Sequence, residues 1–154
     1  MYLKCMKKII VYLIHFSLTL ICFAQDGISW KISHDKKQLF FATEENPDSN
    51  SITLSTSDFK EKGCYTISYA EENTATQRMK WIRTIAVYDE KDNELYKKQS
   101  ATVKITDIVM KKLLTENKTI KIYTWSLPKD PAEAARIRIR RVHLCSIVLS
   151  GKNS

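Results

Sequence analysis

The sequence predicts a mainly β fold, an antiparallel β-sandwich of immunoglobulin-like or jelly-roll kind. Short stretches of alternating apolar and polar residues recur along the chain with the period of half-buried strands. No succession of strand, helix and strand indicates a parallel sheet. The chain has only 3 glycines, so glycine-rich ligand loops are not expected. One short lid helix and a one-turn helix before the last strand complete the expected fold.

Residues 1–24 have the features of a secretory signal peptide. Lysines stand near its start, an apolar stretch runs from Ile9 to Phe23, and Ala24 precedes a plausible cleavage site. A transmembrane anchor is the alternative, but an apolar stretch of about fifteen residues is shorter than the roughly 20 needed to cross a bilayer. A lipoprotein would use Cys22, yet the bulky Ile21 stands where such sites have a small residue. We therefore expect an exported protein that is periplasmic, attached to the cell surface or secreted, with no stable membrane span after cleavage.

Residues 25–154 are long enough for a single domain with one hydrophobic core. Removing the signal takes away three lysines and no acidic residue, which leaves a formal charge of +5 from 22 basic and 17 acidic residues. This modest excess favours anionic partners such as glycans or envelope polymers. Acidic residues are interspersed with the basic ones everywhere except in the last strand, so an ordinary solvated surface is the simpler interpretation.

Four strands are expected in the first half of the exported chain. In the first, at 28–33, Ile28, Trp30 and Ile32 alternate with polar residues. The second, at 38–43, has consecutive apolar residues that suit a strand covered on both faces or one with a bulge. The third, at 51–57, and the fourth, at 64–70, alternate again. The segments 44–51 and 71–78 are expected to be loops.

The second half contains more strands and both helices. Residues 80–90 are apolar on both faces, as in a central strand, and 95–105 continue the strand pattern beyond a hairpin turn. The period changes to that of a helix over 106–116, with Thr106 or Asp107 as N-cap. A strand at 118–127 follows. A one-turn helix is expected at 130–135, with Asp130 as N-cap and Pro131 at the first helical position.

The last strand is expected at 136–149, and it carries most of the basic residues that follow the one-turn helix. Its alternation from Ile137 and Ile139 to Val142 and Leu144 requires one extra residue, which predicts a β-bulge at Arg140 and Arg141. Arg83, in the fifth strand, lies on the face that a regular strand would bury. Either a bulge turns it out to solvent, which is the favoured interpretation, or it is paired in place.

Two cysteines, Cys64 and Cys145, remain after signal cleavage, and an oxidising compartment would pair them. Alternation places Cys64 with the polar face of its strand. If Cys145 shares a face with His143, the two thiols could meet across neighbouring strands. A disulfide is therefore predicted, with two free thiols as the alternative.

The candidate ligand-binding residues are basic and aromatic. Arg136, Arg138 and Arg140 project from one face at strand spacing, and guanidinium groups suit carboxylate, sulfate or phosphate. Tyr123 and Trp125 lie two residues apart together with Lys121, and they could form a flat surface on which a sugar ring stacks. The alternatives are arginines that pair with neighbouring carboxylates and aromatic rings that belong to the core.

Sequence motifs of catalysis are missing. No nucleophile elbow, zinc-binding helix or phosphate loop is present, and no cofactor or metal is expected. The two remaining histidines, His34 and His143, lie on separate strands. His143 and Cys145 are two residues apart, but a catalytic pair needs closer atoms and a third group to orient the histidine.

The sequence therefore favours an exported, non-enzymatic binding or interaction module that takes a glycan, an anionic envelope polymer or a protein. A small hydrolase-like enzyme and a structural subunit that pairs through an edge strand are the alternatives. Nucleic acid is not expected as a partner, because export removes the protein from it.

Overall fold

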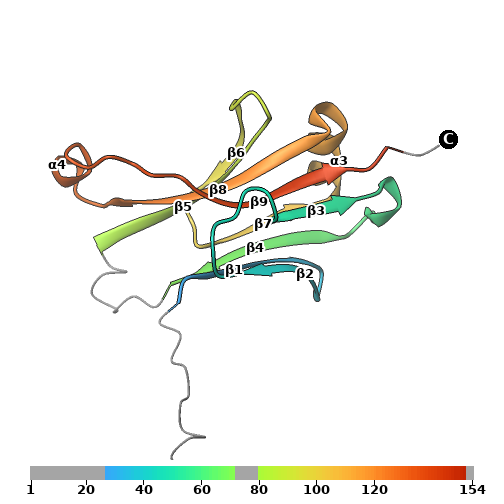
Figure 1. Ribbon diagram of the computed structural model, residues 1–154, viewed down its shortest axis with the longest axis horizontal. Helices are drawn as coiled ribbons and strands as arrows, with labels where there is room; N and C mark the ends of the chain where they lie inside the picture. Colours follow the sequence, from blue (N-terminus) through green and yellow to red (C-terminus); the bar gives the residue numbers. More distant parts are fainter. Residues whose placement is uncertain (1–26, 72–79, 152–154) are drawn as a thin grey trace, which may run out of the picture.

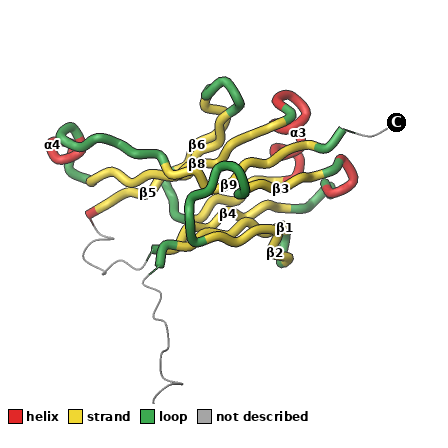
Figure 2. Tube along the Cα trace, in the orientation of Figure 1, coloured by secondary structure: helices red, strands yellow, loops and turns green. Residues whose placement is uncertain are grey.

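The computed structural model describes residues 27–71 and 80–151. Within them the protein is mainly β, with two sheets and two α-helices, and Figure 2 shows strands predominating over helices. The predicted signal at 1–24, the predicted loop at 71–78 apart from Glu71, and the end of the tail lie outside the described residues.

The first sheet has four antiparallel strands in the order β2-β1-β4-β7. They are β1 (Ser29–His34), β2 (Lys37–Ala42), β4 (Cys64–Ala70) and β7 (Thr102–Thr106). The expected alternation is confirmed in β1, where Trp30 and Ile32 are buried, and in β4, where Tyr65, Ile67 and Tyr69 are buried. One face of this sheet therefore supplies the core and the other faces solvent.

The second sheet has five strands in the order β3-β9-β8-β5-β6 and is mixed. They are β3 (Ser51–Leu54), β5 (Trp81–Tyr88), β6 (Glu94–Lys98), β8 (Thr119–Pro128) and β9 (Val142–Leu149). β3 runs parallel to β9, while the other pairs are antiparallel. β5 lies between β8 and β6, as its two apolar faces predicted.

The stretch 95–105, expected to continue one strand pattern, is divided between the two sheets. β6 pairs with β5 in the second sheet, and β7 pairs with β4 in the first. Between them, the Ser100 hydroxyl donates to the Thr102 carbonyl at 2.7 Å. The chain therefore changes sheets at this turn.

One hydrophobic core joins the two sheets. Its members come from strands of both sheets and from α3 (Asp107–Asn117). Trp30 of β1 also donates its indole N–H to the carbonyl of Leu144 in β9 at 2.7 Å, a buried hydrogen bond between the sheets. The core residues are Trp30, Ile32, Leu54, Tyr65, Ile67, Tyr69, Ile85, Val87, Val103, Ile105, Met110, Leu114, Ile120, Ile122, Leu144, Cys145 and Ile147.

Both predicted helices are present, at opposite ends of the molecule (Figure 1). α3 begins after Thr106, whose hydroxyl accepts a hydrogen bond from the Val109 amide, and buries Met110 and Leu114. α4 (Pro131–Ala134) has Asp130 as N-cap, accepting from the Ala132 amide at 2.8 Å. A 3-10 helix, η1 (Thr56–Asp58), replaces the end of the expected third strand. Among the described residues, no helix is long and apolar enough to cross a bilayer.

The last strand is shorter than predicted. β9 begins at Val142, so the arginines at 136–141 lie in the connection that precedes it and form no strand ladder. β3 pairs with β9 only from Ser146 to Leu149. If β9 began earlier, its added residues would have no partner strand on the β3 side and would form an unpaired edge. Charged residues and interrupted pairing are common ways in which proteins avoid such edges.

A bulge is present in this strand, but at Leu144 and not at Arg140 and Arg141 as predicted. Tyr123 pairs with His143 and Ile122 pairs with Cys145, so Leu144 is the extra residue. The bulge turns both Leu144 and Cys145 into the core.

The predicted disulfide is wrong: Cys64 and Cys145 are free cysteines. Cys145 is fully buried in the core, because the bulge places it on the opposite face from His143. Cys64 belongs to the other sheet. It lies on the face of β4 that carries the polar residues, opposite the face with the core positions.

Candidate functional site

Two of the three predicted arginines, Arg138 and Arg140, line a depression on the five-stranded sheet. Its volume is about 550 Å³, and we call it the arginine pocket. It is lined by Tyr123, Arg138, Ile139, Arg140 and Arg141. β8 supplies Tyr123, and the connection before β9 supplies the other four residues.

Arg141 is held against the sheet by aromatic rings. Its Cζ lies 4.8 Å from the ring centroid of Tyr88 and 5.1 Å from that of Tyr123. A guanidinium over an aromatic face is attracted by the electrons of the ring. Its Nη2 donates to Asp92 Oδ2 at 2.8 Å, and this hydrogen bond lowers the pKa of Asp92. Arg141 therefore reaches from the start of β9 across β8 and β5 to the β5–β6 turn.

Arg140 is also paired. It donates to Glu45 Oε2 at 2.6 Å, while Glu45 Oε1 accepts from the backbone amide of His143 at 2.8 Å. Glu45 therefore fixes the edge of β9 and neutralises Arg140. Arg138 is different: among the described residues it forms no ion pair. Its charge is the one in the pocket that remains open to a ligand.

His143 lies beside the pocket and is 4% exposed. Its ring contacts that of Tyr123 edge to face, with centroids 5.4 Å apart, and Nε2 is 3.0 Å from the Ser146 hydroxyl. Its Nδ1 is buried and has no hydrogen-bond partner among the described residues. Burial lowers the pKa of His143, an effect that the charge of Lys121 adds to and that of Glu45 opposes. Burial therefore favours the neutral form of His143.

Three of the six predicted ligand residues, Tyr123, Arg138 and Arg140, line the same pocket. Lys121 and Trp125 are half-buried on the same strand face as Tyr123, outside the lining, and Arg136 is exposed and also outside it. One part of the expected sugar surface is covered, because Arg141 lies over the Tyr123 ring. The sequence did not predict Arg141 as part of this site, since Asp92 and Tyr88 are distant in the chain.

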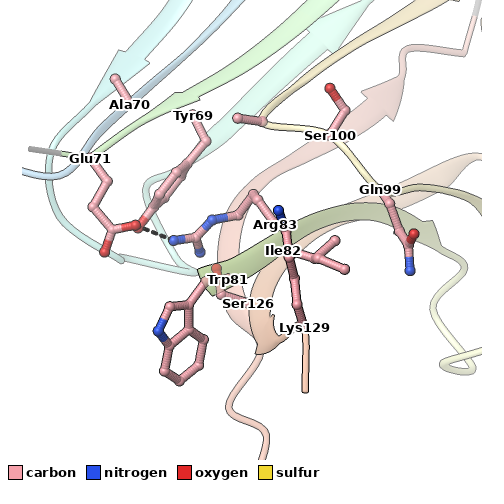
Figure 3. Close-up of a pocket in the computed structure, with 11 residues that line it drawn as sticks. Tyr69, Ala70, Glu71, Trp81, Ile82, Arg83, Gln99, Ser100, Ser126 and Lys129 are labelled. Atoms are coloured by element: carbon pink, nitrogen blue, oxygen red, sulfur yellow. Dashed lines mark hydrogen bonds and ion pairs between the residues drawn. The ribbon is translucent and has the colours of Figure 1, made fainter. Parts of the chain in front are cut away.

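A second pocket, of about 580 Å³, lies where the two sheets meet, and we call it the inter-sheet pocket. Figure 3 shows its residues, which come from β4, β5, β8 and the β6–β7 turn. They are Tyr69, Ala70, Glu71, Trp81, Ile82, Arg83, Gln99, Ser100, Ala101, Ser126 and Lys129. Among the described residues, the two pockets share no lining residue.

Arg83 organises this second pocket. It lies on the same face of β5 as the core residues Ile85 and Val87, and its side chain is 16% exposed. Its Cζ is 4.2 Å from the Tyr69 ring centroid, and its guanidinium forms an ion pair with Glu71 (Figure 3). The favoured prediction of a solvated arginine is therefore wrong, and the alternative, pairing in place, is confirmed. An arginine at a core position of a strand was the sequence signal for this pocket.

A third polar cluster joins His34 to Asp107. The His34 Nε2 lies 2.8 Å from Asp107 Oδ2, and the same oxygen accepts from the Lys60 amide at 2.7 Å. The Asp107 side chain is fully buried, and the His34 ring stacks on Tyr65 with centroids 4.4 Å apart. These contacts tie β1, the loop before β4 and the start of α3 together, which is a structural role.

Within 27–71 and 80–151, no group of three or more His, Cys, Asp or Glu side chains is arranged to hold a metal ion. Comparison of the chain with protein-family models, curated proteins and solved structures finds no match.

Proposed function

We propose that this protein is an exported, non-enzymatic binding module whose arginine pocket takes the anionic groups of an envelope polymer or glycan. One observation carries the proposal: three arginines and a tyrosine surround one depression, and Arg138 has no acidic partner among the described residues. Guanidinium groups bind carboxylate, sulfate and phosphate through paired hydrogen bonds.

The fixed positions of the neighbouring side chains support binding. Arg140 and Arg141 are each held by a carboxylate, and Arg141 is also held by two rings. A pocket whose groups are ordered before the ligand arrives loses less conformational entropy on binding. The ligand then meets one open cation, Arg138, beside partly neutralised ones.

The side chains near the pocket favour binding over nucleophilic catalysis. His143 is the nearby histidine, and the cysteine two residues beyond it points into the core. Burial raises the pKa of the Cys145 thiol to about 12, so the reactive thiolate is not formed at neutral pH.

We further propose that the two sheets form a β-sandwich of immunoglobulin-like or jelly-roll kind. The single core shared by both sheets supports this proposal. The chain departs from a purely antiparallel sandwich in one pair, since β3 and β9 are parallel.

Export is part of the proposal and is supported by residues 1–24. When the full chain is produced in a bacterium, the intact mass of the exported protein should correspond to a start at Gln25. A product that keeps residues 1–24, or one that carries lipid on Cys22, would contradict cleavage after Ala24.

The binding proposal is tested by salt elution from a heparin column. Arg138→Ser should elute at a lower salt concentration than the unchanged protein, because polyanion binding depends on the number of contacting cations. Lys111→Ser, which removes one exposed charge from α3, is the matched control and should have a smaller effect. Equal shifts for both variants would show a general charge effect and contradict a site at Arg138. A phosphocellulose column run in parallel separates phosphate from sulfate and carboxylate ligands.

A further inference from the structure

We propose that the inter-sheet pocket is a second binding site and that it takes a pyranose ring of an uncharged glycan. This inference stands apart from the arginine pocket, because the two pockets have no lining residue in common. Failure of heparin binding would therefore leave it untouched.

Trp81 supplies an apolar surface for the ring. It is at the start of β5 on the core face, yet it is 42% exposed, whereas Trp30 in the core is 2% exposed. One face of a pyranose carries only C–H groups, and such a face packs well on an exposed indole. A large aromatic side chain that is left half-exposed in a polar pocket is a common anchor for a ligand.

Polar groups line the same pocket as this aromatic surface. The guanidinium of Arg83 is clamped between the Tyr69 ring and Glu71, so both the guanidinium and the carboxylate are held in place. Gln99 lies on the other side of Arg83 from Trp81 in Figure 3. Ser100 and Ser126 add hydroxyl groups to the lining. Planar carboxylate, guanidinium and amide groups can each form two hydrogen bonds with neighbouring hydroxyls of a sugar.

The charges of the pocket favour an uncharged ligand. Glu71 and Arg83 neutralise each other, which leaves Lys129 as the one unbalanced charge among the described lining residues. The arginine pocket, in contrast, has three cations around one depression. A volume of about 580 Å³ is in the range of small-molecule sites and accommodates a sugar ring with part of its neighbour.

Indole N–H signals provide a direct test. The chain has 3 tryptophans, so a protein labelled with ¹⁵N gives one indole cross-peak each for Trp30, Trp81 and Trp125. Trp81→Phe identifies the peak of Trp81. The labelled protein is titrated with glucose, galactose, mannose, N-acetylglucosamine and their disaccharides, and with glycerol as a polyol control.

We expect at least one of these sugars to shift the Trp81 peak saturably while the Trp30 and Trp125 peaks stay in place. Trp81→Ala should then weaken the binding of that sugar by about tenfold or more, because it removes the stacking surface. Binding to this variant is measured from the shifts of backbone amide peaks. Glu71→Gln keeps the shape of the pocket and should weaken sugar binding less than Trp81→Ala does. Phe41→Ala removes a ring that is 55% exposed on the four-stranded sheet, and it should leave sugar binding unchanged. The proposal is overturned if no sugar moves the Trp81 peak more than glycerol does, or if Trp81→Ala binds as tightly as the Phe41→Ala control.

Discussion

The guanidinium of Arg141 lies over the ring of Tyr123, its Cζ 5.1 Å from the ring centroid, and the same group reaches Asp92 at 2.8 Å. One side chain thereby connects the start of β9 with β8 and with the turn between β5 and β6. The residue lines the arginine pocket, and it is not fully buried: its side chain is 36% exposed.

Arg141→Lys should destabilise the fold by about 1 kcal/mol, because lysine keeps the charge but loses the contacts of the guanidinium with two rings and the directed hydrogen bond to Asp92. Urea unfolding measures the difference. Arg138→Lys is the matched control, since no described ring lies against Arg138. Equal stability of the two variants would contradict a structural role for the stacked arginine.

Stability should fall as the pH drops below about 6.5. Burial lowers the pKa of His143 in the folded protein below its ordinary value of 6.5, so the unfolded chain takes up the proton first. Stability is therefore lost from about 6.5 downward, until the folded pKa is reached. Unfolding free energies measured along this range should change less in His143→Gln, whose side chain does not titrate. A variant with the same pH dependence as the unchanged protein would refute the assignment.

In the protein cleaved after Ala24, as proposed, the two remaining cysteines should react at very different rates. Cys64 is partly exposed, whereas Cys145 is buried and burial raises its pKa to about 12. Iodoacetamide should modify one thiol of the native protein and the second only after unfolding, as followed by intact mass. The fast reaction should disappear in Cys64→Ser. A mass two hydrogens lower than that of the reduced chain would instead reveal a disulfide.

Gly63 and Asp107 should be coupled. A Cβ at Gly63 would lie 2.2 Å from Asp107 Oδ2, so Gly63→Ala must displace the carboxylate that His34 and the Lys60 amide share. We expect a cost of at least about 2 kcal/mol, from steric overlap and from the loss of these buried contacts.

A double-mutant cycle tests this coupling. In Asp107→Ala the obstructing carboxylate is gone, and adding Gly63→Ala should then cost much less than it does alone. Additive costs in urea unfolding would show that the strain at Gly63 has another origin.

Much of the fold followed from alternation along single strands. The buried positions Trp30, Ile32, Tyr65 and Ile67 were predicted because a period of two places them on one face. The one-turn helix followed from Asp130 and Pro131 in the same way, since capping is local.

Features that depend on distant residues could not be predicted. The alternation of 95–105 is compatible with one strand or with two, and only the pairing partners place β6 and β7 in different sheets. The extra residue before the last core positions was expected, but Leu144 rather than Arg140 or Arg141 takes that place. For the site, the basic residues were identified from their spacing, whereas Glu45 and Asp92, which hold two of them, lie far away in the sequence.

The position of β9 has a consequence for how the protein acquires its structure. The last strand of the described residues is inserted between β3 and β8, and it supplies Leu144, Cys145 and Ile147 to the interior. In a ribosome-bound chain that lacks these residues, the five-stranded sheet cannot be completed, because β9 is its second strand. We expect the five-stranded sheet of such nascent chains to stay unstructured until β9 has been synthesised, because the distant pairing of β3 with β9 must wait for residues 142–149. A polypeptide of this kind remains able to be threaded through a translocation channel for longer than one whose early strands form a closed unit.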